Sequence, residues 1–268
     1  MSEQYVLETR NLVKEFKGFV AVNDVNLQIR QGDIHALIGP NGAGKTTVFN
    51  LLTKFLIPTR GQILYRGEDI TPLKSAAIAR KGIIRSFQIS AVFPHMTALE
   101  NIRVALQTAE GSSYSFWKSG NSLHKLNERC MELLESVGLA EFANTTTVEL
   151  AYGRKRALEL ATTLAMEPQL LLLDEPTQGM GSEDVDRVVE LVRKAAQGRT
   201  VLMVEHNLSV VSKLCDRITV LAQGAVLTEG DYQTVSADPR VREGYMGSDG
   251  SGERGSQATT SENVEAAQ

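Results

Sequence analysis

Apolar and polar positions alternate along the first 30 residues in the manner of short β-strands. Residues 5–9 form one such stretch, and residues 20–29 form a second that is broken by Asn and Asp turn residues. Residues 33–38 read as a strand that runs into a Gly-rich turn, after which residues 45–55 have a helical pattern. A further strand is predicted at residues 62–65. These patterns predict an antiparallel sheet edge followed by a strand–turn–helix unit.

The middle of the chain, residues 95–165, changes to helical spacing and contains few β-branched residues. One amphipathic helix is expected to end at Gly138. Within this part, residues 110–121 are rich in Gly and Ser, and we expect them to form an exposed loop. The pattern indicates a helical subdomain inserted into an α/β core. The apolar face of the amphipathic helix consists of Leu126, Cys130, Leu133, Leu134 and Val137.

Strand and helix alternate in the last third of the chain. Strands are predicted at residues 170–173, 200–204 and 218–221, with helices at 183–196 and 208–214 between them. Strands separated by helices of this length pair in parallel through right-handed crossovers. The expected fold class is therefore α/β, a core with a mostly parallel sheet, an N-terminal antiparallel β subdomain and an inserted α-helical subdomain.

We expect one folded unit over residues 1–247. Within it, residues 1–92 and 166–247 would form the α/β core, and residues 93–165 the helical subdomain. Residues 248–268 contain mainly Gly, Ser, Glu, Thr and Ala, and such a segment buries too little apolar surface to order itself. We therefore expect a disordered tail.

Composition and charge exclude several classes of protein. The 268 residues are 42% hydrophobic and 22% charged, which is ordinary for a globular protein with a buried core. The net charge is −4, most of it in residues 247–268, so the folded part has no general attraction for nucleic acid. No apolar run is long enough to span a bilayer, and the first residues lack the pattern of an export signal. We expect a cytosolic chain in which Cys130 and Cys215 are buried thiols.

A phosphate-binding motif follows the strand at residues 33–38. Its glycines let backbone N–H groups face phosphate oxygens, and the N-terminus of the next helix adds partial positive charge. Lys45 would reach the β and γ phosphates, the Thr46 hydroxyl would ligate Mg²⁺, and Thr47 could touch the α phosphate. The alternative, a chance glycine turn, does not explain the strand before and the helix after. The motif reads Gly39, Pro40, Asn41, Gly42, Ala43, Gly44, Lys45 and Thr46. It predicts that the α/β core is a P-loop NTPase core.

Two carboxylates end the apolar strand at residues 170–173. Asp174 fits the role of Mg²⁺ anchor, and Glu175 stands where a base could orient the water that attacks the γ phosphate. Alone, such a pair would more often be a solvated turn. Together with the phosphate motif it predicts hydrolysis of a nucleoside triphosphate.

From about residue 5 to 247, these elements resemble the ATP-binding subunits of ABC transporters. Gln88 resembles the family's Q-loop glutamine, which senses the metal and the attacking water, and would share in holding the metal. His206 follows Glu175 by 31 residues and resembles the switch histidine that contacts the γ phosphate. Phe16 occupies the place of the aromatic that stacks on adenine. A core phenylalanine is the alternative reading, and Phe19 lies nearby.

The family's Leu-Ser-Gly-Gly-Gln signature is altered in this chain. Ala151 lacks the hydroxyl that reaches the partner's nucleotide, Tyr152 follows it, and Arg154 replaces Gln. Gly153 and the N-terminus of the next helix still offer backbone donors to a phosphate. The resemblance therefore implies a weakened contact of residues 151–153 with the nucleotide of a partner subunit.

Three further residues have expected roles. Lys155 and Arg156 could assist a phosphate, but a solvated helix face is the favoured interpretation. Gly181 stands where many family members carry Asp, which bears on communication between subunits.

Within the family, the chain looks most like the branched-chain amino acid and urea importer branch. The motifs are Arg85-Ser86-Phe87-Gln88, the Leu-Ala-Tyr-Gly signature, Glu205-His206-Asn207 and the segment 239–247. The resemblance implies ATP and Mg²⁺ as cofactors, and a location on the cytoplasmic side of the inner membrane. It further implies a second ATPase subunit, identical or related, in an ATP-sandwich dimer, with two membrane permeases and a periplasmic solute-binding protein. No nucleic-acid partner is expected.

Three alternative functions stay open at this point. They are the ATPase of a lipopolysaccharide-type ABC exporter, a soluble ABC-type ATPase without a membrane partner, and a P-loop kinase. A groove behind Gln88 would accept a short permease helix, although its apolar residues could instead belong to the core. The groove residues are Ile89, Ala91, Val92 and Phe93.

Overall fold

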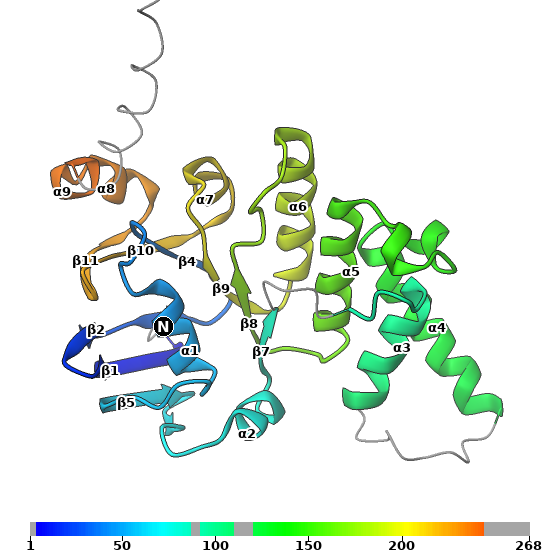
Figure 1. The fold of residues 1–268 in the computed structure, drawn as a ribbon, viewed down its shortest axis with the longest axis horizontal. Helices are drawn as coiled ribbons and strands as arrows, with labels where there is room; N and C mark the ends of the chain where they lie inside the picture. Colours follow the sequence, from blue (N-terminus) through cyan, green and yellow to red (C-terminus); the bar gives the residue numbers. More distant parts are fainter. Residues whose placement is uncertain (1–3, 87–91, 110–119, 244–268) are drawn as a thin grey trace, which may run out of the picture.

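The computed structural model describes residues 4–86, 92–109 and 120–243, and it contains two sheets beside a group of helices (Figure 1). The first sheet is antiparallel, as the alternating N-terminal pattern predicted. It joins β1 (Tyr5–Phe16), β2 (Phe19–Val25), β3 (Gln28–Arg30), β5 (Arg60–Tyr65) and β6 (Glu68–Asp69).

The second sheet has the order β11-β10-β4-β9-β8-β7, and all its pairs are parallel except β10 with β11. All residues of β4, β8 and β9 are buried. Because both faces of these strands are covered, they read as continuous apolar runs. The bounds are β4 (Ile34–Ile38), β7 (Ile83–Ser86), β8 (Leu170–Asp174), β9 (Thr200–Val204), β10 (Arg217–Ala222) and β11 (Ala225–Gly230).

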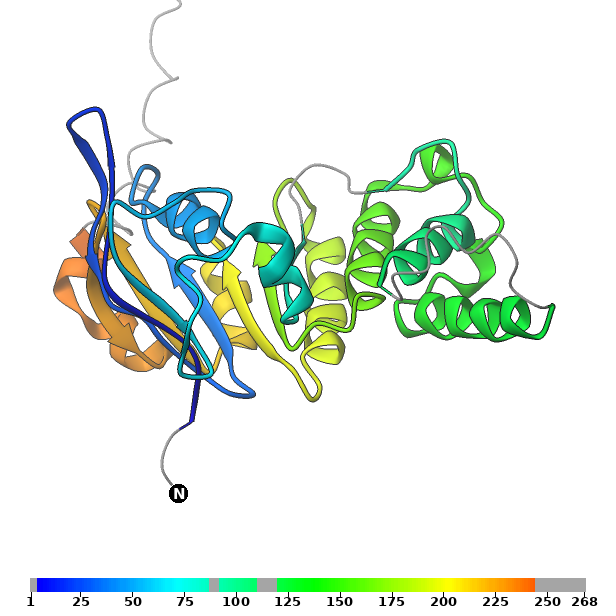
Figure 2. The same ribbon diagram turned by 90° about the horizontal axis from the view of Figure 1, so that it is seen from below.

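Helices cover the second sheet and extend from it at one side (Figures 1 and 2). Leu37 and Leu172 face an apolar cluster with α1 and the first sheet, whereas Ile38 and Leu171 face a second cluster that includes α3, α4 and α5. The bounds are α1 (Lys45–Leu52), α2 (Ser75–Arg80), α3 (Ala98–Ala109), α4 (Gly120–Ser136), α5 (Tyr152–Leu164), α6 (Ser182–Ala195), α7 (Leu208–Leu214), α8 (Tyr232–Ala237) and α9 (Pro239–Val241), with short 3₁₀ turns η1 (Ala140–Phe142) and η2 (Thr147–Glu149).

Several predicted boundaries were wrong. Strand β1 continues to Phe16, since irregular pairing near Asn11, which has a φ of 49°, interrupts the alternation without ending the strand. Helix α1 ends at Leu52 rather than near residue 55, because Lys54 adopts a left-handed φ of 60°. The sequence reading also missed β7, α2 and β11.

The predicted loop at 110–121 lies outside the described residues over 110–119, and its last two residues begin α4. Helices α3, α4 and α5 fall within the predicted helical segment 93–165, whose boundaries stay a prediction. The tail predicted at 248–268 also lies outside the described residues. Both cysteines are free; Cys130 is buried and Cys215 is partly buried. No helix in the described part of the chain combines the length and apolar character that a membrane span needs.

Candidate nucleotide site

Three of the predicted site segments lie at one edge of the second sheet. Strands β4, β9 and β8 are adjacent and parallel, so the loops after their carboxyl ends emerge side by side. Those loops carry Lys45, His206 and the pair Asp174 and Glu175. The carboxyl edge of a parallel sheet is where such folds bind ligands.

The phosphate motif folds as a tight loop that depends on two of its glycines. Gly39 has a φ of 150°, and a Cβ there would stand 2.2 Å from the carbonyl oxygen of Leu221. Gly44 has a φ of 100°, and a Cβ there would stand 2.6 Å from the carbonyl oxygen of Ala21 in β2. Only glycine tolerates both approaches. The loop therefore packs closely against β10 of the second sheet and β2 of the first sheet.

The outer part of this loop faces solvent, while its lysine does not. Pro40, Asn41, Gly42 and Thr46 are exposed, Thr47 is half-buried, and Ala43 is buried. The Ala43 carbonyl oxygen accepts a 3.0 Å hydrogen bond from the Gly224 N–H, which fixes the loop against the turn between β10 and β11.

Lys45 is the first residue of α1, and its side chain is folded back into the loop. The residue is only 8% exposed, and Nζ donates hydrogen bonds to the carbonyl oxygens of Gly39 (2.6 Å) and Pro40 (3.1 Å). Burial lowers the pKa of Lys45, while the negative charges of Glu175 and Asp174 act in the opposite direction. Both carboxylates therefore lie within electrostatic reach of the ammonium group.

Asp174 ends β8 and forms an ion pair with a residue that the sequence reading named only as part of a motif. The Arg85 guanidinium contacts Oδ2 of Asp174 through Nη2, and Nη1 donates to Oδ1 of Asn50 at 2.6 Å. The same guanidinium lies 5.8 Å from the ring centroid of Phe49. Arg85 thus connects β7, β8 and α1.

Glu175 follows immediately in an uncommon backbone conformation. Its φ is 47°, its N–H donates to the carbonyl oxygen of Val204 at 2.9 Å, and its carbonyl oxygen accepts from the Gln178 N–H at 3.1 Å. The residue is half-buried. These backbone bonds hold it at the sheet edge next to the loop that carries His206, an exposed residue directly after Glu205.

Phe16 and Phe19 are cross-strand partners next to the β1–β2 turn, where Lys17 and Gly18 have positive φ. The two rings are 41% and 67% exposed, and Lys14 Nζ lies 5.0 Å from the Phe16 ring centroid. The alternative reading of Phe16 as a core residue is therefore wrong. Gln88 lies outside the described residues.

The altered signature forms the start of α5, away from α1 in both ribbon views (Figures 1 and 2). Ala151 is the N-cap and makes no side-chain cap bond, so the first N–H groups of α5 are left for other acceptors. Tyr152 is exposed, and its hydroxyl donates to the Gln178 carbonyl oxygen at 3.2 Å. Gly153 lies beside Asp184: a Cβ there would stand 3.2 Å from that carboxylate.

The two basic residues after the signature differ in their surroundings. Lys155 Nζ donates to the Val148 carbonyl oxygen at 3.0 Å. Arg156 has a side chain only 12% exposed, and it donates to Glu159 at 2.9 Å and to the Tyr152 hydroxyl at 3.2 Å. The prediction of a solvated face was wrong for Arg156, because Glu159, one turn later on the same helix, draws its guanidinium into the protein. The guanidinium carbon Cζ of Arg154 lies 3.9 Å from the centroid of the Phe142 ring, over its face.

Comparison with known proteins gives a consistent result. Residues 22–178 match the protein family described as "ABC transporter". The chain is 40% identical over 249 residues to the high-affinity branched-chain amino acid transport ATP-binding protein BraF of Pseudomonas aeruginosa, covering 90% of this chain and 98% of BraF. It is 36% identical over 248 residues to the lipopolysaccharide export system ATP-binding protein LptB of Acidithiobacillus ferridurans, covering 92% and 98%.

Among solved structures, the chain is similar to the ATP-binding cassette MJ0796, which was solved as a dimer in a post-hydrolysis state bound to ADP and Pi. The TM-score is 0.71 at 28% sequence identity, covering 84% of this chain and 98% of that one. The predicted α/β fold is thereby confirmed.

Proposed function

Because this chain belongs to the ABC transporter family of ATP-binding proteins, we propose that it binds and hydrolyses ATP to power an importer for branched-chain amino acids or a related small polar solute such as urea. One observation carries the proposal: strands β4, β9 and β8 are adjacent and parallel, so the phosphate loop after β4 and the acidic pair at the end of β8 lie at the same edge of the sheet. The 40% identity to BraF supports the class of solute.

In this proposal the loop of residues 39–47 binds the triphosphate. Backbone N–H groups of the loop face the phosphates, Lys45 exchanges its carbonyl partners for β and γ oxygens, and Thr47 contacts the α phosphate. Phe16 stacks on adenine from the adjacent antiparallel sheet. Glu175 orients and deprotonates the attacking water, and His206 contacts the γ phosphate.

Thr46, Asp174 and Gln88 are the residues that would hold Mg²⁺. A nucleotide-bound Mg²⁺ is usually held by one or two protein carboxylates together with phosphate oxygens and water. Thr46 offers a hydroxyl oxygen and Asp174 a carboxylate oxygen, which are the oxygen donors that Mg²⁺ prefers, so these residues fit the ion. When bound, the ion neutralises charge on the β and γ phosphates.

The other half of each site would come from a second ATPase subunit, identical or related. Residues 151–153 lie at an uncapped helix start, away from α1, which suits a contact with the nucleotide of the partner rather than their own. ATP held between the subunits would close the dimer, and hydrolysis would let it open. The likeness to a dimeric cassette supports this arrangement.

We place two membrane permeases and a periplasmic solute-binding protein in the same assembly, with this chain on the cytoplasmic side of the inner membrane. A hollow of about 320 Å³ between α2, β7, α3 and α5 is our candidate for the permease contact. Of the groove residues expected from sequence, Val92 is buried in the core and Phe93 is exposed; Ile89 and Ala91 lie outside the described residues. The hollow is lined by Phe55, Ile78, Ile83, Ile84, Ala105 and Met166, among others.

A lipopolysaccharide exporter ATPase is the second candidate function, and the 36% identity to LptB supports it. The test is reconstitution with the permeases from each type of system. We expect Mg²⁺-dependent release of phosphate from ATP and uptake of a branched-chain amino acid into proteoliposomes only with importer permeases. Activity with exporter permeases alone would favour the second candidate, and phosphate transferred to an acceptor would indicate a kinase.

Replacing Phe16 by Ala is expected to weaken ATP binding about tenfold, since stacking of a base on an aromatic ring contributes about 1–3 kcal/mol. Folding should be unaffected because the ring is 41% exposed. Titration with a fluorescent ATP analogue measures the affinity, and Phe19→Ala is the matched control, since Phe19 is the direct cross-strand partner. An unchanged affinity in Phe16→Ala combined with a loss in Phe19→Ala would move the stacking role to Phe19.

A further inference from the structure

A fully buried carboxylate lies between the two loops that carry Glu175 and His206. Glu205 is 0% exposed. Its Oε1 accepts hydrogen bonds from Thr177, at 3.1 Å from the N–H and 2.6 Å from the hydroxyl. Its Oε2 accepts from the backbone N–H groups of His206 (3.0 Å) and Asn207 (3.2 Å). Burying a carboxylate is costly unless it is hydrogen-bonded, and here both oxygens are satisfied.

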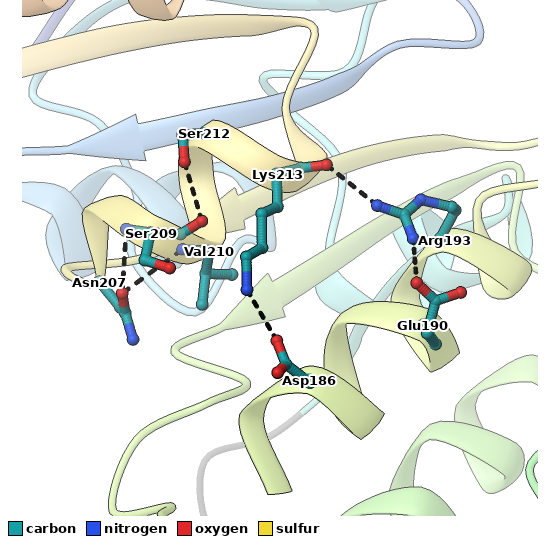
Figure 3. A network of polar contacts seen from close by, with 8 residues as sticks. All are labelled: Asp186, Glu190, Arg193, Asn207, Ser209, Val210, Ser212 and Lys213. Carbon is teal, nitrogen blue, oxygen red and sulfur yellow. Dashed lines mark hydrogen bonds and ion pairs between the residues drawn. The ribbon is translucent and has the colours of Figure 1, made fainter. Parts of the chain in front are cut away.

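The four donors come from two different loops. Thr177 is 5% exposed and belongs to the turn that begins at Glu175, which the bond from Gln178 N–H to the Glu175 carbonyl oxygen closes. Asn207 caps α7 by accepting hydrogen bonds from the N–H groups of Ser209 and Val210 (Figure 3). Glu205 therefore joins the turn after β8 to the start of α7.

Other links between the helices that follow these loops are exposed. Lys213 on α7 pairs with Asp186 on α6 at 2.8 Å, and Arg193 on α6 donates to the Lys213 carbonyl oxygen at 3.1 Å (Figure 3). Exposed ion pairs contribute little to stability because water screens them. Relative placement of the two loops thus depends more on the buried carboxylate than on these surface contacts.

We propose that Glu205 is a positioning residue that sets the Glu175 carboxylate and the His206 imidazole at the separation required around the γ phosphate. The inference rests on the proposed ATPase function. Glu205 does not itself reach the nucleotide; it acts through the backbone of both loops. A misplacement of about 1 Å at a reacting centre can slow a reaction about a hundredfold.

Glu205→Gln is the sharpest variant, because it keeps the size of the side chain and changes one acceptor into a donor. If the NH₂ group of the new amide faces His206 and Asn207, it opposes two backbone N–H donors. If it faces Thr177, it opposes the backbone N–H of that residue. Either orientation leaves at least one backbone N–H without its acceptor, and we expect it to displace one loop. We expect kcat for ATP hydrolysis to fall at least about tenfold, while KM for ATP changes less than about twofold.

Two variants at Thr177 provide the matched control. Thr177→Val removes the hydroxyl that donates at 2.6 Å but keeps the shape, so kcat should fall with KM unchanged. Thr177→Ser restores the hydroxyl and should recover most of the lost kcat. These variants also keep the test decisive if Glu205→Gln unfolds, which its melting curve would reveal.

A further comparison separates positioning from general stability. If Glu205 acts through Glu175, adding Glu205→Gln to a Glu175→Gln chain should slow hydrolysis much less than it slows the natural chain. Full kcat in folded Glu205→Gln or Thr177→Val protein would overturn the inference and leave the ATPase assignment intact. A natural chain that does not hydrolyse ATP in the assembled transporter would instead overturn the proposed function.

Discussion

The Glu175→Gln variant is expected to bind ATP normally and to release phosphate at least about a hundredfold more slowly than the natural chain. An amide cannot accept the proton of the attacking water, and losing a general base costs about this much. The backbone bonds of Glu175 to Val204 and Gln178 do not involve its side chain, so the site should keep its shape. Phosphate release in the assembled transporter and titration with ATP measure the two effects.

A suitable control is Glu190→Gln, which makes the same chemical change on the exposed face of α6. We expect its hydrolysis rate to stay within about twofold of the natural rate, as for most surface substitutions. Undiminished phosphate release from Glu175→Gln would remove this residue from the role of base.

Replacing Arg85 by Met is expected to lower the free energy of unfolding by about 3 kcal/mol. The Arg85 and Asp174 side chains are only 10% and 2% exposed, so the variant would leave an uncompensated charge in the interior. Denaturation in urea measures the loss.

The double variant Arg85→Met with Asp174→Asn tests the cause of this loss. Without the unpaired charge, stability should recover in part relative to Arg85→Met alone. A loss below about 1 kcal/mol in the single variant would mean that water or a neighbouring group compensates Asp174 in solution.

The parts of the fold that sequence could predict are those with a strong local pattern. Strand β9 and helix α7 have the predicted bounds, because a continuous apolar run and an N-capping Asn define them without help from distant residues. The position of the phosphate loop and the acidic pair at one sheet edge was also predictable, since β4 and β8 are buried parallel strands of the same sheet.

Other features depend on partners far along the chain. Glu205 belongs to the motif Glu205-His206-Asn207. Its contact with Thr177, however, joins residues 28 positions apart and follows only from the pairing of β8 with β9. Arg85 similarly meets an aspartate 89 residues away. Strand β11 was missed although Gln223 and Gly224, both with positive φ, form a short turn before it, a hairpin signal that the sequence did carry.

Contacts within the chain hold the phosphate loop in shape. The Lys45 ammonium group donates to two carbonyl oxygens, and the Gly224 N–H donates to the Ala43 carbonyl oxygen. Gly39 also packs closely against the Leu221 carbonyl oxygen. A loop restrained in this way has few backbone rotations left to lose when a ligand docks, so the entropic penalty of binding is small. Affinity for ATP would therefore be sensitive to a substitution at Gly224, which has a φ of 80° and where a Cβ would stand 2.9 Å from the Ala21 carbonyl oxygen.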